Sequence, residues 1–150
     1  MSTSEHYPLV QTDELCFSFA TDGGSKYELV FVFLPSEQSI PLYTFNIERL
    51  VDGKHLLADS IKIRNTIAFA LQSFFENIDN AILSTCEVDD GKQFARKKLF
   101  DRWFNQLNDG NVLMMETQVD SGIGMTWATM YYHKDNMFRS LLETMFHELT

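Results

Sequence analysis

The sequence predicts an α+β fold with a single mixed sheet of about six strands and helices packed on it, in the order β-β-β-α-β-α-β-β-α. Short runs that alternate apolar and polar residues occur near both ends of the chain, and three segments repeat apolar residues at helical spacing. Hydrophobic residues make up 45% of the chain, with 13 Phe, which is enough to form a packed core. A length of 150 residues predicts one domain over 1–150.

The N-terminal third predicts three strands. Residues 15–20 and 27–34 have strand character and are separated by the run Thr-Asp-Gly-Gly-Ser at 21–25. Such a run is typical of a turn, so the two strands should form a hairpin. Residues 42–47 alternate again and predict a third strand.

The middle of the chain predicts two helices around one strand. The first helix begins near Asp59 or Ser60, either of which could cap it, and the second covers 92–107 after an aspartate cap. Residues 81–88 form a short apolar run of strand length. Because each helix follows a strand, both could be crossovers that make parallel neighbours. The apolar positions of the first helix are Ile63, Ile67, Ala70, Leu71, Phe74, Phe75 and Ile78.

The C-terminal part predicts a second hairpin and a last helix. Residues 112–119 and 125–132 flank a glycine-containing loop, and Asp135 or Asn136 could cap the helix that follows. Its apolar face could cover the sheet or contact a partner. Amphipathic helices usually pack on their own domain, so covering is expected. That face carries Phe138, Leu141, Leu142, Met145, Phe146 and Leu149.

Composition limits the location and partners. The formal net charge of −9 disfavours a nucleic-acid backbone as a partner. No run is long and apolar enough for a transmembrane helix, and residues 1–8 lack the pattern of a secretory signal. We therefore expect a cytoplasmic protein in which Cys16 and Cys86 are reduced.

One group of cations predicts a ligand site. Arg64, Lys92 and Arg96 fall inside the apolar arcs of the two middle helices, near the helix starts. A cation there is unusual, because an unpaired buried charge costs several kcal/mol. If the preceding strands are parallel neighbours, these cations and two helix N-termini would converge and bind an anion. The proposed anion-binding residues are Arg64, Asp90, Gly91, Lys92, Gln93 and Arg96.

The same pattern has a structural interpretation. Asp59, Asp89 and Asp90 stand at the same helix starts and could form ion pairs with Arg64 and Arg96. No spacing typical of a metal site occurs, because the four histidines are scattered. No nucleophile with a base beside it is visible, so no catalytic residue is assigned.

Two segments resemble known proteins. Residues 59–75 and 90–104 resemble the signature of an uncharacterised family of small bacterial proteins, with Asp-Gly-Lys-Gln at 90–93, then Arg96, Phe100 and Trp103-Phe104. The resemblance implies a domain of unknown function and no activity.

The order of elements is similar to the core of the GCN5-related N-acetyltransferase fold. In that family a strand, the next helix N-terminus and the following strand hold the pyrophosphate and pantetheine arms of coenzyme A. Ala95 and Phe100 loosely match the family's later helix. The glycine-rich turn is absent here, and Phe100 stands where a tyrosine acid is expected, so the similarity implies a fold rather than an activity.

Two functions follow from these observations. The first is a non-enzymatic binding or protein-interaction module, which could be homo-oligomeric, with the acidic N-terminal third or the last helix as its partner surface. The second is an atypical acyltransferase-like domain that binds a phosphate-bearing ligand such as coenzyme A at the two helix N-termini. If the chain is an enzyme, it would be an acyl-coenzyme A-dependent transferase; no cofactor is established.

Overall fold

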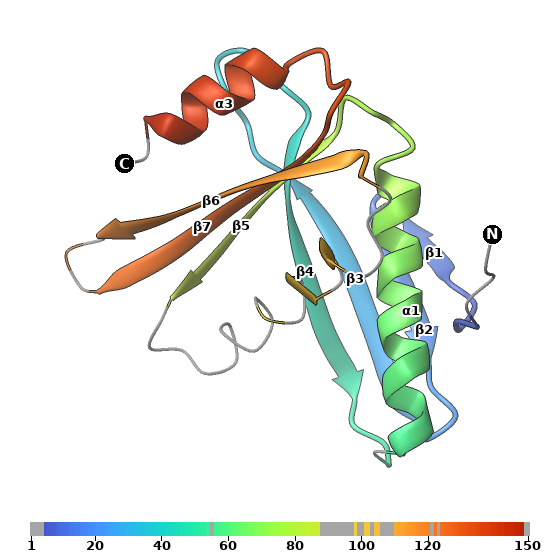
Figure 1. Cartoon of the computed structure of the whole chain (residues 1–150). Coiled ribbons are helices and arrows are strands. Elements are labelled where there is room, and N and C mark those ends of the chain that lie inside the picture. Colours follow the sequence, from blue (N-terminus) through green and yellow to red (C-terminus); the bar gives the residue numbers. More distant parts are fainter. Residues whose placement is uncertain are drawn as a thin grey trace. The chain divides into compact units, whose positions relative to one another are not determined.

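The computed structural model confirms the α+β class (Figure 1). The residues that it describes form one mixed sheet of seven strands, the helices α1 and α3, and a few further helical residues between 98 and 105. It describes residues 5–54, 56–87, 98, 101–102, 104–105, 110–120, 122 and 124–148. The strands are β1 (Val10–Asp13), β2 (Cys16–Ala20), β3 (Lys26–Phe33), β4 (Leu42–Val51), β5 (Ala81–Glu87), β6 (Val112–Asp120) and β7 (Met125–His133). The helices are α1 (Leu57–Phe74) and α3 (Arg139–His147).

The strand order in the sheet is β1-β2-β3-β4-β5-β7-β6. The extra strand relative to the expected six is β1, which pairs antiparallel with β2 and has an irregular register between Gln11 and Asp13. All four of its residues are exposed. The apolar pattern did not predict β1, because a short, exposed edge strand needs no apolar alternation.

Both predicted hairpins and one of the two parallel pairings are confirmed. The other parallel pairing is wrong: β5 and β6, which precede and follow the second predicted helix in sequence, are not neighbours, because β7 lies between them and pairs antiparallel with both. β2 and β3 form the first hairpin and β6 and β7 the second, both antiparallel. β4 and β5 are parallel neighbours, with Leu42 opposite Ala81 and Tyr43 opposite Ile82. The helix between them in sequence, α1, is therefore a crossover between parallel strands, as expected.

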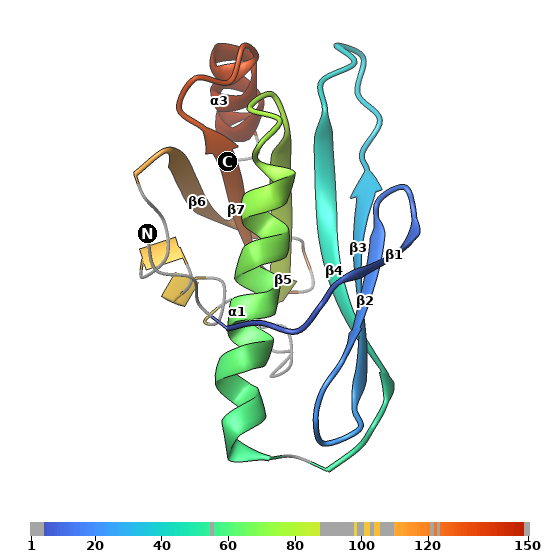
Figure 2. The same cartoon turned by 90° about the vertical axis from the view of Figure 1, so that its right-hand side faces the viewer.

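The described residues divide into two compact units. The first comprises Met1–Val32 and Phe45–Glu76, and the second Phe33–Thr44 and Asn77–Thr150. In the first unit α1 runs alongside β2 and β3 (Figures 1 and 2). The rings of Phe31 and Phe74 stack with centroids 4.1 Å apart, which ties the end of α1 to β3. The other buried apolar residues of this unit include Phe19, Leu29, Phe45, Ile67 and Ala70.

The second unit has its own core, on which α3 packs. Leu142 and Phe146 of α3 are buried against residues of β5 and β7. The expectation that the last helix covers its own domain is therefore confirmed for these two side chains. The core of the second unit consists of Ile40, Leu42, Ala81, Ala128, Met130, Tyr132, Leu142 and Phe146.

Helix boundaries differ from the predictions. α1 starts two residues before Asp59, with Leu56 at the N-cap position and no side-chain cap, and it ends at Phe74 rather than Ile78. α3 begins at Arg139, with Phe138 at the cap. Asn136 lies three residues before the first residue of α3, and its Oδ1 accepts a hydrogen bond from the Phe138 N–H at 2.7 Å. Both predicted caps were wrong because these side chains satisfy other backbone or tertiary partners.

The helix predicted over 92–107 lies mostly outside the described residues. Its described members, Lys98, Asp101, Arg102, Phe104 and Asn105, are helical. No described helix is long and apolar enough to cross a membrane.

The turn at 21–25 positions the start of α1. Gly23 lies against the loop after β4, where the Lys54 N–H donates to the Gly23 carbonyl at 2.9 Å. A Cβ atom on Gly23 would lie 2.2 Å from the Lys54 carbonyl oxygen, so only glycine fits. This close contact holds the β2–β3 turn beside the residues that lead into α1.

Candidate functional site

A surface pocket of about 380 Å³ lies at the start of α1, entirely within the first unit. Three parts of the chain form it: the N-terminal segment, the turn between β2 and β3, and the first turns of α1. Figure 2 shows the N-terminal segment crossing α1 before it enters β1. The pocket is lined by Glu5, Asp22, Ala58, Asp59, Ile61, Lys62 and Asn65.

Asp59 holds the three parts together. It is the third residue of α1 and only 4% exposed. Its Oδ1 accepts a hydrogen bond from the Tyr7 hydroxyl, and its Oδ2 accepts one from the Gly23 N–H at 3.1 Å. A carboxylate in the first turn of a helix also interacts favourably with the helix dipole. Asp59 is therefore a buried anchor rather than the predicted cap.

Tyr7 is the buried counterpart of Asp59 in the N-terminal segment. Its backbone N–H donates to Thr66 Oγ1 at 2.8 Å, and its hydroxyl also accepts a hydrogen bond from the Asp22 N–H at 3.4 Å. Burial, followed by the hydrogen bond to Asp59, raises the pKa of Tyr7 from 10.0 to about 12. The phenol therefore stays protonated at neutral pH.

Lys62 is the one basic residue among those that line the pocket. Its ammonium lies 5.0 Å from the centroid of the Tyr7 ring, at cation–π distance, and 3.9 Å from Asp22 Oδ2. Glu5 is fixed through its backbone, because the Asn65 side-chain amide donates to the Glu5 carbonyl at 3.0 Å. Three carboxyl groups thus line the pocket with one ammonium, which makes it acidic.

Exposed apolar side chains lie beside the pocket. Leu57 is 89% exposed and Ile61 is 60% exposed, and they are four residues apart on α1, so they share one face. Leu56, just before the helix, is exposed as well. We call Leu56, Leu57 and Ile61 the α1 patch. Ile61 also lines the pocket, so the apolar patch and the acidic pocket are continuous.

Arg64 is the single predicted anion-binding residue that the structure describes. It is half-buried and is the eighth residue of α1, so its Cα lies about 10 Å along the helix from Leu57 rather than in the first turn. The Asp59 oxygens accept hydrogen bonds from Tyr7 and Gly23, and no ion pair between Asp59 and Arg64 occurs among the residues that the structure describes. No ion pair joins Arg64 to another residue of the described part. Its role in anion binding stays a prediction.

The other predicted site residues lie outside the described residues. They are Asp90, Gly91, Lys92, Gln93 and Arg96, together with Asp89 as a pairing partner. The structural condition behind the prediction, the parallel pairing of β4 with β5, is confirmed.

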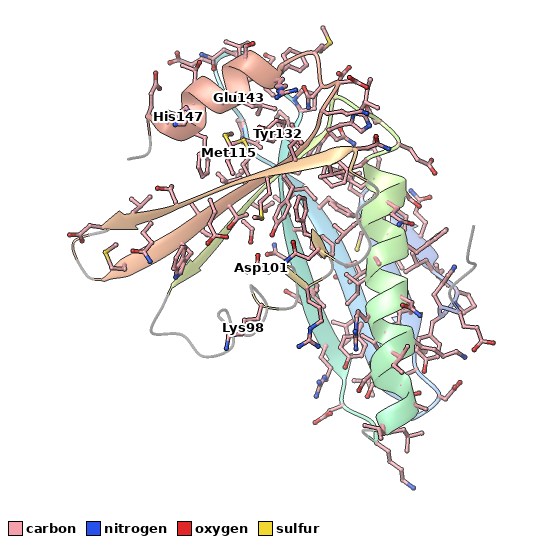
Figure 3. The ribbon with its side chains drawn as sticks, in the orientation of Figure 1. Lys98, Asp101, Met115, Tyr132, Glu143 and His147 are labelled. Atoms are coloured by element: carbon pink, nitrogen blue, oxygen red, sulfur yellow. The ribbon has the colours of Figure 1, made fainter. Side chains whose placement is uncertain are left out.

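The second unit carries another polar group, on the side of β7 that faces α3 (Figure 3). Burial, with the neighbouring Glu143 carboxylate, raises the pKa of the Tyr132 phenol. The Arg139 Nε donates to Glu143 Oε1 at 2.7 Å, four residues along the helix. The Arg139–Glu143 pair lies within α3, and Glu143 places its charge near Tyr132 of β7.

Tyr7, Asp22 and Lys62 were not predicted as site residues. The turn containing Asp22 was recognised, but nothing in the sequence linked it to a tyrosine fifteen residues away or to a helix forty residues away. The exposure of Leu57 was also hidden, since large apolar residues are most often buried.

The fold and site together define an α+β protein with a mixed sheet and an acidic pocket at the start of its crossover helix. The chain belongs to a family of unknown function, DUF6169, whose model matches residues 59–148. The expected membership of a family of unknown function is thereby confirmed. The matched region begins at Asp59, so the pocket combines the family region with N-terminal residues outside it. No curated protein and no solved structure matches the chain.

Proposed function

We propose that this chain is a non-enzymatic protein-interaction module that binds its partner through the α1 patch and the adjoining pocket. The observation that carries this proposal is the exposure of Leu57 and Ile61, at 89% and 60%, on one face of α1. Grouped exposed apolar residues with polar neighbours mark interaction sites more often than scattered ones do. Burying a leucine or isoleucine contributes about 1.5 to 3 kcal/mol, so a partner that covers both gains substantial affinity.

The state of Tyr7 supports binding rather than catalysis. A general acid or base works best with a pKa near the working pH and with access to substrate. Tyr7 is 4% exposed, and its pKa is about 12. Its proton is directed at Asp59, whose second oxygen is bound by Gly23. The pair therefore serves to hold the N-terminal segment on α1.

Site-specific photocrosslinking in cells tests the proposal. The crosslinking residue p-benzoylphenylalanine would replace Ile61 in one protein and Met137, which is 73% exposed in the second unit, in a control. We expect a discrete crosslinked product at position 61 that is absent at 137 and is lost on Leu57→Asp. A product of twice 17.4 kDa would identify a second copy as the partner. Equal labelling at both positions, or labelling insensitive to Leu57→Asp, would contradict it.

A second candidate is a degenerate acyltransferase-like domain that binds coenzyme A or another phosphate-bearing ligand. The parallel neighbours β4 and β5, with α1 between them in sequence, support it, because such a strand-helix-strand unit holds coenzyme A in the resembling family. The charge at the start of α1 opposes it. Asp59 and Asp22 would repel a pyrophosphate there.

A thermal-shift screen separates the two candidates. Coenzyme A, acetyl-coenzyme A, common nucleotides and inorganic phosphate would be tested against the wild-type chain and Arg96→Ala. A ligand at 100 times its dissociation constant adds about 2.7 kcal/mol of stability, or several degrees. A shift that disappears in Arg96→Ala would favour the acyltransferase-like domain. The interaction module predicts no shift with any of these anions.

A further inference from the structure

We infer that the partner presents a basic, amphipathic segment, with an aliphatic side chain on the α1 patch and a lysine or arginine in the adjoining pocket. This inference rests on the proposed function and names the chemistry of the occupant. It follows from which carboxylates of the pocket are already engaged, from how they are held, and from the size of the pocket.

The carboxylates available to a partner are those of Glu5 and Asp22. Asp59 is buried, and both its oxygens accept hydrogen bonds from within the chain. Glu5 and Asp22 are exposed, and Glu5 makes no ion pair within the described part of the chain. Lys62 reaches Asp22 at 3.9 Å while its ammonium stays over the Tyr7 ring, so it offsets one charge of the two.

Both carboxylates are carried on backbone that is already fixed. The Asn65 amide holds the Glu5 carbonyl at 3.0 Å, and the Asp22 N–H lies 3.4 Å from the Tyr7 hydroxyl. A partner therefore meets two acids whose backbone needs little further ordering. A cation from the partner would add a second positive charge beside Lys62 and bring the group of Glu5, Asp22 and Lys62 to neutrality.

The pocket is large enough to receive a side chain from a partner. Its volume of about 380 Å³ is near the lower end of the range for small-molecule pockets, which is about 300 to 1,000 Å³. That volume has room for one long basic side chain together with water. The aliphatic stem of a lysine or arginine can also pack on Ile61, which lines the pocket and belongs to the α1 patch.

Selection from random 12-residue peptides displayed on phage tests this chemistry even while the partner is unidentified. Peptides would be selected on the wild-type chain, with counter-selection on a Leu57→Ser, Asp22→Lys variant whose fold is checked by circular dichroism. We expect the enriched peptides to combine Lys or Arg with aliphatic residues and to carry net positive charge. The inference would be overturned if the enriched peptides were neutral or acidic, or if no peptide were enriched on the wild-type chain relative to the variant.

The best peptide would then be measured by fluorescence polarisation against matched variants. We expect the pair Glu5→Gln and Asp22→Asn to weaken binding about tenfold and to reduce its salt dependence, because exposed charges act mainly through screened attraction. Asp120→Asn, at an exposed strand end in the second unit, should change nothing. If Asp120→Asn weakens peptide binding as much as the Glu5→Gln, Asp22→Asn pair does, the inference is overturned. If position 61 crosslinks but no basic peptides are enriched, the interaction module stands and its partner has a different chemistry. If neither a crosslink nor basic peptides are found, both the proposed function and this inference are wrong.

Discussion

At the scale of single residues, Tyr7 and Asp59 carry the organisation of the site. They are separated by 52 positions in sequence and form a hydrogen bond in a buried environment. The bond joins the N-terminal segment to α1, while Gly23 brings the β2–β3 turn to the same carboxylate. Because the three parts meet at one side chain, the shape of the pocket depends on this pair.

Removing the Tyr7 hydroxyl should destabilise the first unit. Tyr7→Phe leaves Asp59 Oδ1 buried without its donor, so we expect the free energy of unfolding to fall by about 1 to 3 kcal/mol. Urea denaturation followed by circular dichroism measures the change. A double-mutant cycle with Asp59→Asn is the control, and fully additive losses would show that the hydrogen bond contributes nothing.

The same pair predicts how stability depends on alkaline pH. Folding raises the pKa of Tyr7 from 10.0 to about 12, so the folded state favours the protonated phenol. This contribution is complete below about pH 10 and is lost as the pH rises from about 10 to 12. The wild-type chain should therefore lose more stability than Tyr7→Phe over this range. Tyr131 and Tyr132, whose pKa values are also raised, are present in both proteins, so parallel curves would contradict the assignment.

At the scale of elements, the helices show where sequence periodicity succeeds. The spacing of Ile67, Ala70 and Phe74 identified the buried face of α1, and that of Leu142 and Phe146 the buried face of α3. The helix starts were predicted less well. Asp59 matches the sequence preference of a cap, but its carboxylate bonds to residues distant in sequence, and α1 begins before it.

Neighbouring leucines of α3 should respond differently to truncation. Leu142 is fully buried in the core of the second unit, whereas Leu141 is 44% exposed. We expect Leu142→Ala to cost about 2 to 5 kcal/mol, because it leaves a cavity. Leu141→Ala should cost less than about 1 kcal/mol. Chemical denaturation of both variants compares them, and equal losses would mean that α3 does not pack as the structure shows.

At the scale of the whole molecule, each compact unit has its own buried core. Ile67 of α1 belongs to the core of the first unit, and Leu142 of α3 to that of the second. Part of the negative charge of the chain is concentrated in the first unit, because the pocket with Glu5, Asp22 and Asp59 lies there. The net charge of −9 therefore includes a local acidic surface in the first unit.

Separate cores predict additive effects on stability. Ile67→Val should cost about 0.5 to 1.5 kcal/mol, and combined with Leu142→Ala the losses should add to within about 0.5 kcal/mol. Denaturation of the two single variants and the double variant provides the comparison. A coupling larger than about 1 kcal/mol would show that the two cores are energetically one.

The sequence by itself determined the α+β class, both hairpins, the crossover between parallel strands and the buried faces of α1 and α3. Each of these follows from local patterns, because apolar periodicity and turn residues act between near neighbours. The pocket was decided by tertiary structure alone. The pocket is lined by Glu5, Asp22 and residues at the start of α1, which are distant in sequence. No local sequence pattern predicts that the Tyr7 hydroxyl donates a hydrogen bond to Asp59. The exposure of Leu57 is equally a tertiary property, because it depends on which surfaces the rest of the chain leaves uncovered.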